Sequence, residues 1–371
     1  MIELITTLGL LSAVMYLLIL LYLIIGIIRT KTELTDEQPF VSVIVAAHNE
    51  DQNIKACLDA LLNQDYSQEK MEIIIVNDRS EDDTGLIVNK YEKNNTLIRV
   101  LTISDCVLGL SPKKNALTHG INIANGEIIA VTDADCRAPI QWLKRGVSYF
   151  TPETGMVVGL APLNPTSWWM SPLMCLDAIV GGITAYGSLG WNHAVTCTGR
   201  NLFYRKKLFE EIGGFSGIDH ILMGDDDLLM MKIRRQTDWK IRFMPDGNSA
   251  VLSDAPTGWR QFVSQRSRHI SASKYFLFSV KAGFGITFIS KLIIILFVFV
   301  LLVGNGTSHL NIALIIILPY LATFLLLIMM SIKVRQASNI LFYPLWEIYY
   351  IFNQLMIGPL GFFGQTTWGK K

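Results

Sequence analysis

The chain has 371 residues, enough for one large domain or two smaller ones. Its formal net charge of +1 gives no electrostatic case for a nucleic-acid partner, so none is expected. Only 17% of the residues are charged and 51% are hydrophobic, against roughly 25% charged in a typical soluble protein. The apolar excess lies at the two ends of the chain, which indicates membrane segments around a soluble centre.

Residues 8–28 form an uninterrupted apolar run that is long enough to cross a bilayer as a helix. A cleaved signal peptide is the alternative, but no basic segment precedes the run and no small-residue cleavage site follows it. Arg29 and Lys31 follow directly, and cytoplasmic flanks are rich in such residues. We therefore expect residues 1–31 to be a retained anchor that places the next domain in the cytoplasm.

The C-terminal region, residues 276–371, contains two further apolar runs, at 284–304 and 310–332. Both are expected to be transmembrane helices, because each is about as long as a bilayer-spanning helix must be. The stretch 340–363 is a weaker candidate because it contains Glu347 and other polar residues. It is either a fourth span or a re-entrant segment.

Residues 32–275 have the charges and turn residues of a soluble domain. Early in this region four apolar, β-branched runs alternate with two amphipathic helical patterns. This alternation is typical of βαβ units and predicts an α/β domain with a parallel sheet. The predicted strands are residues 40–47, 71–77, 97–103 and 127–133, and the predicted helices are residues 50–64 and 111–125.

Polar side chains follow three of the predicted strands, at the point where each strand ends. They are His48, Asn49 and Glu50 after the first strand, Asn77 and Asp78 after the second, and Asp133 and Asp135 after the fourth. Ligands of parallel sheets bind beyond the carboxyl ends of the strands. Asn and Asp also favour helix caps and turns, which would explain any one group. All three together favour a ligand site.

Asp133 and Asp135 stand one residue apart at the end of an apolar run. Carboxylates this close repel each other unless a cation lies between them, and Mg²⁺ or Mn²⁺ prefers oxygen ligands. We therefore expect a metal site that also binds a diphosphate. The five cysteines include no CxxC pair, which argues against a zinc site, and there is no P-loop motif.

Seven motifs follow one another between residues 40 and 275: VSVIVAAHNE, VNDRSEDDT, SPKKNAL, TDADC, CTGRNLFYRK, GDDDLLM and QRSRH. In order and spacing this set resembles the membrane-bound family 2 glycosyltransferases. A lone DxD motif is weak, whereas the ordered set flanked by membrane spans is specific. The resemblance implies a GT-A fold, a Rossmann-like nucleotide-sugar domain, flanked by one N-terminal and two or three C-terminal transmembrane helices.

The resemblance also implies which residues bind the donor. They are Ala47, His48, Glu50, Asp78, Lys113, Asp133, Gln265 and Arg268, with Asp135 and Asp133 at the metal. The family often has arginine at the position of His48 and a second aspartate at that of Asn77, so both depart from the pattern. For Lys113 and its neighbour Lys114, a solvated helix N-terminus is the alternative.

The GDDDLLM segment resembles the family's ED motif, whose second acidic residue is the general base. This alignment implies that Asp226 is the base, with Asp225 as the alternative. A base is needed because an acceptor hydroxyl is a poor nucleophile until its proton is removed. Attack opposite the departing diphosphate inverts the sugar carbon. A solvated acidic turn is the simpler interpretation, although apolar residues flank the segment.

The QRSRH segment resembles the family's QxxRW motif, with Gln265 and Arg268 present and His269 in place of tryptophan. The resemblance implies that Arg268 approaches the diphosphate and that position 269 lies on the acceptor side. A guanidinium suits this role because it can bind two phosphate oxygens at once. A basic juxtamembrane cluster that touches anionic lipid is the alternative.

Two segments, near 167–191 and 257–275, are expected at the membrane surface. The first is apolar and carries tryptophans, which favour the headgroup region. Such a segment could admit a lipid acceptor. The resemblance places Gly199 and Asn201 on the acceptor side.

These features favour an inverting glycosyltransferase that moves a sugar from a nucleotide-diphospho-sugar, UDP being the expected nucleotide, to a lipid or glycan acceptor. The small number of spans favours a lipid over a processive polysaccharide synthase. A transporter or a non-catalytic scaffold is a further alternative, but the spans contain few ionisable residues and the key carboxylates are present. The expected location is a bacterial inner membrane, with several spans and a cytoplasmic catalytic domain.

Overall fold

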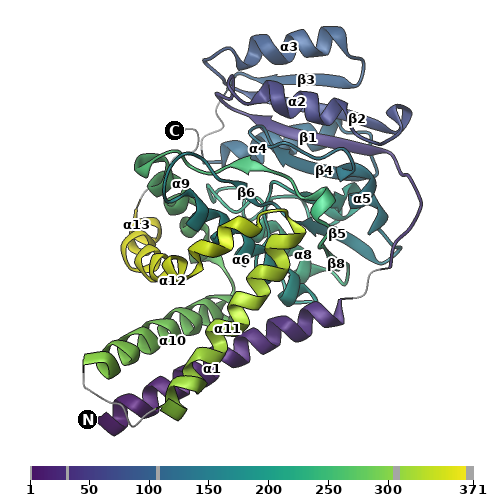
Figure 1. Cartoon of the computed structure of the whole chain (residues 1–371). Helices are drawn as coiled ribbons and strands as arrows, with labels where there is room; N and C mark the ends of the chain where they lie inside the picture. Colours follow the sequence, from purple (N-terminus) through teal and green to yellow (C-terminus); the bar gives the residue numbers. More distant parts are fainter. Residues whose placement is uncertain (1, 31–32, 106–108, 304–309, 365–371) are drawn as a thin grey trace.

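The computed structural model describes residues 2–30, 33–105, 109–303 and 310–364. Its main sheet has seven strands in the order β3-β2-β1-β4-β7-β5-β8, and β6 and β9 pair separately (Figure 1). The strands are β1 Val41–Ala47, β2 Met71–Asp78, β3 Ile98–Ile103, β4 Ile128–Asp133, β5 Thr154–Gly159, β6 Leu163–Asn164, β7 Leu202–Arg205, β8 Lys240–Met244 and β9 Ser253–Asp254.

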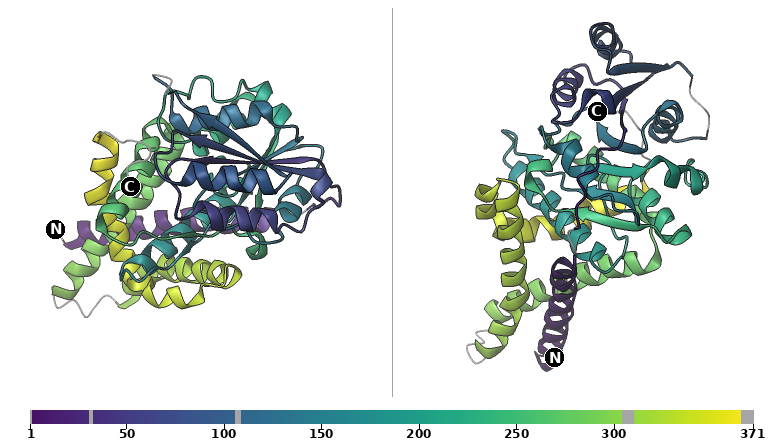
Figure 2. Two further views of the ribbon diagram at one scale, coloured as in Figure 1. Left: turned by 90° about the horizontal axis from the view of Figure 1, so that it is seen from above. Right: turned by 90° about the vertical axis from the view of Figure 1, so that its right-hand side faces the viewer.

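Helices surround the sheet and extend away from it. They are α1 Ile2–Arg29, α2 Ile54–Leu62, α3 Thr84–Asn94, α4 Pro112–Ile123, α5 Trp142–Ser148, α6 Ser171–Leu189, α7 Lys206–Glu211, α8 Asp227–Gln236, α9 Trp259–Ala272, α10 Phe278–Val303, α11 Leu310–Lys333, α12 Tyr343–Phe352 and α13 Gly358–Phe363. The right-hand view of Figure 2 shows α1, α10 and α11 projecting together to the side opposite β1–β3.

The four strands predicted from the sequence form the parallel part of the sheet. β1 pairs with β2 and with β4, and β2 pairs with β3, all in parallel. Their β-branched residues suit a sheet that is covered on both faces. β7 then enters antiparallel to both β4 and β5, so the complete sheet is mixed. The predicted α/β class is confirmed, with strand boundaries within a residue of those predicted.

The two faces of β1 belong to different hydrophobic clusters, as strand alternation requires. Val43 and Val45 pack with residues of α2 and α5 in one cluster, whereas Ile44 packs with residues of α4 in the other. α4 approaches closely at Gly120, where a Cβ would lie 2.8 Å from Cγ2 of Ile44. Packing on both faces holds β1 and its neighbours in place. It therefore also positions the carboxyl ends of these strands, where the polar residues lie.

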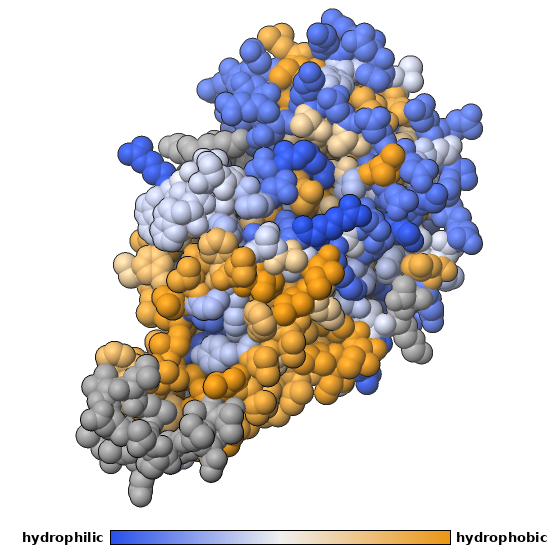
Figure 3. Space-filling model, in the orientation of Figure 1, coloured by the Kyte–Doolittle hydropathy of each residue, from blue (hydrophilic) through white to orange (hydrophobic). Residues whose placement is uncertain are grey.

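Within the described part of the chain, four helices are long and apolar enough to cross a membrane: 4–29, 171–189, 278–300 and 315–333. Figure 3 shows the resulting apolar belt over the lower half of the molecule, interrupted by a small hydrophilic patch. Three of these helices were predicted as spans. The fourth is α6.

Residues 343–363 are helical throughout but do not form one regular α-helix. α12 is followed by a π-helical turn at Asn353–Ile357 and then by the short α13, which begins at Gly358–Pro359. The proline cannot donate a backbone hydrogen bond, so it starts a new helix there. Both interpretations of this stretch, a fourth span and a re-entrant segment, stay predictions.

α6 lies inside the protein, between the sheet and the long helices. It contacts α1, α11, α12 and β8. At its contact with α1, Gly26, Gly187 and Gly190 let the two backbones meet, because a Cβ on Gly26 would lie 1.8 Å from the carbonyl oxygen of Gly187. The predicted interfacial segment is thus a largely buried helix, and its depth in a bilayer stays a prediction.

Candidate active site

The ends of β1, β2 and β4 lie side by side, as the sequence predicts. Ala46 of β1 is in register with Asp133 of β4, and Ala47 is in register with Asn77 of β2. His48 follows β1, and its Nδ1 lies 2.6 Å from the carbonyl oxygen of Asp78. The next residue, Asn49, turns the chain with φ of 56°, a conformation that asparagine tolerates better than most residues.

Lys113, on the first turn of α4, joins two carboxylates from distant segments. Its Nζ lies 2.8 Å from Oδ1 of Asp133 and 2.9 Å from Oδ2 of Asp225. Burial alone would lower the pKa of Lys113, but the surrounding carboxylates raise it well above its usual value. The lysine therefore stays charged and links the TDADC motif to the GDDDLLM motif.

Asp135 has no ion-pair partner among the described residues. Burial first, and then the negative charges of Asp133 and Glu50, raise its pKa above the usual value. Oxygens of Asp133 and Asp135 and the Sγ of Cys136 all lie within 4.8 Å of one another. An under-compensated carboxylate beside a second one fits a hard divalent cation, so these residues could hold Mg²⁺ or Mn²⁺.

Three consecutive aspartates organise the facing wall of the site. Asp226 caps α8: its Oδ1 accepts from the backbone N–H of Asp227 at 2.7 Å, and its Oδ2 accepts from the N–H of Gly199 at 2.7 Å. Oδ1 of Asp227 accepts from the N–H of Cys197, also at 2.7 Å. Both carboxylates thereby hold the loop before β7 against α8. Burial, followed by mutual repulsion, raises the pKa of Asp227.

Asp225 is the least solvated of the linked carboxylates, with its side chain 10% exposed. Burial raises its pKa, Lys113 opposes that rise, and Asp226 and Asp133 add to it, so the net shift is upward. Repulsion between the adjacent aspartates thus contributes to the raised pKa values of Asp225 and Asp227, with burial as the larger cause.

The segment before these aspartates is held by the start of α4. Nζ of Lys114 donates to the carbonyl oxygens of Ile221 and Met223, at 2.5 and 2.9 Å, and Oγ of Ser111 donates to the carbonyl oxygen of Leu222 at 2.9 Å. Burial lowers the pKa of Lys114 to about 8. A solvated helix N-terminus is therefore the wrong explanation for Lys114, which is 1% exposed.

α9 carries the QRSRH segment and is tied to α6 and α12 by Arg266. Nη2 of Arg266 forms an ion pair with Asp177 of α6 and donates to the Tyr349 hydroxyl at 3.1 Å. Burial, together with the neighbouring arginines, lowers the pKa of His269 to about 3, so its imidazole is neutral at neutral pH. Burial also lowers the pKa of Arg268.

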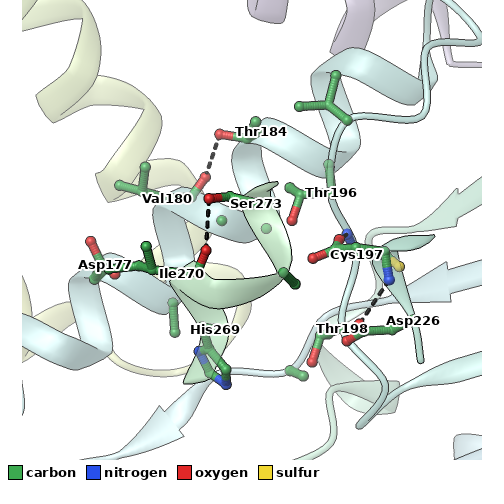
Figure 4. Close-up of a pocket in the computed structure, with 18 of the residues that line it drawn as sticks. Asp177, Val180, Thr184, Thr196, Cys197, Thr198, Asp226, His269, Ile270 and Ser273 are labelled. Atoms are coloured by element: carbon green, nitrogen blue, oxygen red, sulfur yellow. Dashed lines mark hydrogen bonds between the residues drawn. The ribbon is translucent and has the colours of Figure 1, made fainter. Parts of the chain in front are cut away.

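These groups face one cavity of about 1390 Å³. In Figure 4, Asp177 and His269 lie on one wall, and Thr196, Cys197, Thr198 and Asp226 lie on the facing wall. The expected residues that line the cavity are His48, Glu50, Lys113, Asp133, Asp135, Gly199, Asp225, Asp226, Gln265, Arg268 and His269. The fold brings these residues from distant segments to one cavity.

Three expected residues do not line this cavity. Ala47 points to the opposite face of the sheet, toward α2, because successive strand residues alternate, and Ala46 lines the cavity instead. Asp78 is 1% exposed, and both of its carboxylate oxygens accept from Arg79, at 2.7 and 3.0 Å. Asp78 therefore pairs with the adjacent residue, Arg79, and the motif did not predict this ion pair.

Asn201, the third expected residue, lies behind the cavity lining in a hydrogen-bond network. It is fully buried; its Nδ2 donates to the carbonyl oxygens of Leu160 and Ser249, and its Oδ1 accepts from Nε1 of Trp142 at 2.9 Å. These bonds leave the side chain no group to offer a ligand in the cavity. Buried amides are retained for this kind of satisfied network.

Sequence reasoning missed Arg200 and Asp177, which also line the cavity. Arg200 donates to the carbonyl oxygen of Ala161 and to Oγ of Ser253, both at 2.6 Å, and its charge acts on Asp133 and Asp135. Arg200 lies within the CTGRN motif, which was a usable signal. Asp177 is an isolated acid in an apolar run, and such a residue is itself a sign of a pairing or function.

Known protein families and individual proteins that resemble this chain are glycosyltransferases. The family description "Glycosyl transferase family 2" matches residues 42–213, and "Glycosyl transferase family group 2" matches residues 128–332. "Probable glycosyltransferase YdaM" of Bacillus subtilis is 29% identical over 67% of this chain and 58% of its own length. "Beta-monoglucosyldiacylglycerol synthase" of Trichormus variabilis is 28% identical over 62% of this chain and 49% of its own length.

The chain thus spans about half the length of the curated relatives it matches. The solved structure of the mannosyltransferase PcManGT from Pyrobaculum calidifontis, in complex with GDP-Man and Mn²⁺, is 18% identical. It matches with a TM-score of 0.61 over 94% of this chain and 99% of that one, which supports the GT-A fold. With the ordered motifs gathered around one cavity and these family matches, the chain belongs to the family 2 glycosyltransferases.

Proposed function

We propose that this protein is an inverting, metal-assisted glycosyltransferase that moves a sugar from a nucleotide diphosphate to a lipid acceptor. The observation that carries the proposal is the single cavity that begins at Asp133, Asp135 and Asp226 and continues between α1, α6 and α10. One end has the carboxylates for donor chemistry. The other is walled by helices long enough to lie in a bilayer.

Asp226 is the proposed general base. Its carboxylate is held by two backbone N–H groups, and each oxygen keeps a further lone pair to accept a proton. The hydroxyl of the acceptor loses its proton to Asp226 as its oxygen attacks the sugar carbon, and the bond to the diphosphate breaks on the opposite side. Asp225, held by Lys113 at 2.9 Å, is the alternative base.

Asp133 and Asp135 are the proposed metal ligands. A divalent ion bound there would neutralise charge on the leaving diphosphate. Arg268, Gln265 and Lys113 supply further donors toward that side of the cavity, and a guanidinium is suited to phosphate oxygens. His48 and Glu50 then lie on the nucleoside side.

The proposed acceptor is a diacylglycerol-type lipid. One relative of this chain is a beta-monoglucosyldiacylglycerol synthase. In addition, the apolar end of the cavity suits acyl chains better than a polar glycan. The proposed donor is a UDP-sugar, with GDP-sugars as the competing class because the PcManGT structure holds GDP-Man. The proposed setting is a bacterial inner membrane, with the sheet domain on the cytoplasmic side next to Arg29.

A donor screen tests this proposal. Detergent-purified protein is incubated with UDP- and GDP-sugars and diacylglycerol, with Mn²⁺ or with chelator, and the product anomer is read by NMR. Asp226→Asn should lower transfer by about 10²–10⁴-fold, the usual contribution of a general base, while donor binding is kept. Asp225→Asn tests the alternative base, and a loss of transfer larger than that of Asp226→Asn would assign the role to Asp225. Full activity of Asp226→Asn would reject Asp226 as the base, and a retained anomer would reject inversion.

A further inference from the structure

The cavity has a branch that runs from the carboxylates into the membrane helices. On α10 its wall is one face of the helix, from Ser279 through Phe284 and Phe288 to Lys291. These positions cover 12 residue steps, or ~18 Å at 1.5 Å per residue. Tyr16 and Leu20 of α1 line the same branch.

Three hydroxyl groups of the cavity lining are bonded back to the protein. Oγ1 of Thr184 donates to the carbonyl oxygen of Val180 at 2.9 Å, Oγ of Ser273 donates to that of Ile270 at 2.7 Å, and Oγ1 of Thr287 donates to that of Gly283 at 2.9 Å. Figure 4 shows the first two of these bonds. With these hydroxyls engaged, the wall presents mainly carbon atoms, which suits a hydrocarbon chain rather than a glycan.

Lys291 is the last residue of α10 in the cavity lining. Its side chain is 2% exposed, and its Nζ lies 2.6 Å from Oε2 of Glu347 on α12. Three rings surround the ammonium, with centroids 4.9 Å away for Tyr16, 4.6 Å for Trp346 and 4.8 Å for Tyr350. The charge is thus fully engaged by the protein, and Trp346 and Tyr350 also line the cavity.

We propose that this branch holds one hydrocarbon chain of the lipid acceptor and that the Lys291 cluster, with Glu347, Trp346 and Tyr350, limits the length of chain accepted. The inference rests on the proposed function for the identity of the lipid. The occupant is a chain because the branch is apolar along its walls, continuous with the catalytic carboxylates and enclosed by helices of membrane-spanning length. Its end is closed because an unbroken ion pair and three rings fill the space between α10 and α12.

Photolabelling of the full-length protein in nanodiscs tests this directly, without any turnover. Two diacylglycerol probes carry a diazirine at either the ester end or the methyl end of one chain, and labelled residues are mapped by mass spectrometry. The expected label shifts from Ser279 and Val280 with the first probe to Phe288 and Lys291 with the second. Labelling of only the 54% exposed Ile289 and the 55% exposed Leu296, whichever probe is used, would overturn the proposal.

Trp346→Ala provides the second test, because it removes a ring from the closed end. The longest chain that competes with the methyl-end probe should become longer, whereas Leu345→Ala, on the exposed side of the same helix, should leave it unchanged. The length limit would be overturned if both variants changed the longest competing chain equally, or if neither variant changed it. Should Trp346→Ala not fold, the wild-type label map still decides. Correct labelling with no sugar transfer would leave the inference standing and reject the proposed function.

Discussion

Replacing Lys113 by methionine is predicted to destabilise the protein through electrostatics rather than packing. The lysine lies 2.8 Å from Asp133 and 2.9 Å from Asp225, and its removal leaves both carboxylates without their cation. Breaking a buried pair costs about 3–5 kcal/mol, and because the three side chains are 10–30% exposed the loss here should fall at the lower end, ~3 kcal/mol. Methionine keeps most of the side-chain volume, so the change reports the charge.

The pH dependence distinguishes this cause from a packing defect. In the folded protein Lys113 and neighbouring cations outweigh burial and hold the pKa of Asp133 below its usual value. That contribution to stability is present above the unfolded pKa of about 4 and is lost as pH falls through the lower folded value. The difference between wild type and Lys113→Met should therefore shrink at acidic pH.

The assay is denaturant unfolding in detergent at neutral and acidic pH, followed by tryptophan fluorescence. Lys144→Met is the matched control, because Lys144 pairs with Asp65 at 3.0 Å but both side chains are about half exposed. Such a surface pair contributes about 0–1 kcal/mol. Equal losses for the two variants, or a loss for Lys113→Met that does not change with pH, would refute the reasoning.

Three further predictions concern packing around the site. Asp177→Asn weakens the ion pair that joins Arg266 of α9 to α6, so steady-state kinetics should show a raised KM while the protein stays folded. Gly26→Ala places a Cβ 1.8 Å from the Gly187 carbonyl oxygen, so size-exclusion chromatography should show aggregated rather than folded protein. Asn201→Ala leaves buried partners unsatisfied and should lower the free energy of unfolding by about 1–3 kcal/mol, with acceptor KM unchanged in the folded fraction.

Each of these predictions has its own control. Gly358→Ala meets nothing within 4 Å and should behave as wild type, so aggregation of that variant would remove the argument from Gly26. Asp177→Glu keeps the negative charge, so its KM should stay close to that of the wild type. A KM as high as that of Asp177→Asn would indicate a steric role for Asp177. A raised acceptor KM in Asn201→Ala would support the expected acceptor-side role of Asn201.

Much of this protein is determined locally by its sequence. The predicted strands and the apolar runs at 8–28, 284–304 and 310–332 correspond to observed elements, because alternation of side chains and uninterrupted apolar stretches act over a few neighbouring residues. The alignment of the strand ends was also foreseeable, because consecutive parallel strands place their carboxyl ends at one edge.

Contacts between distant segments were decided only by the tertiary structure. The bridge from Lys113 to Asp225, the burial of α6 and the engagement of Asn201 by Trp142 each join residues that no local pattern relates. The chemistry of a carboxylate or an amide depends on which group it pairs with in the folded protein, as the ion pair between Asp78 and its neighbour Arg79 illustrates. For the same reason the sequence could supply the residues of the site, whereas the continuous cavity that joins them to the long apolar helices exists only once the chain has folded.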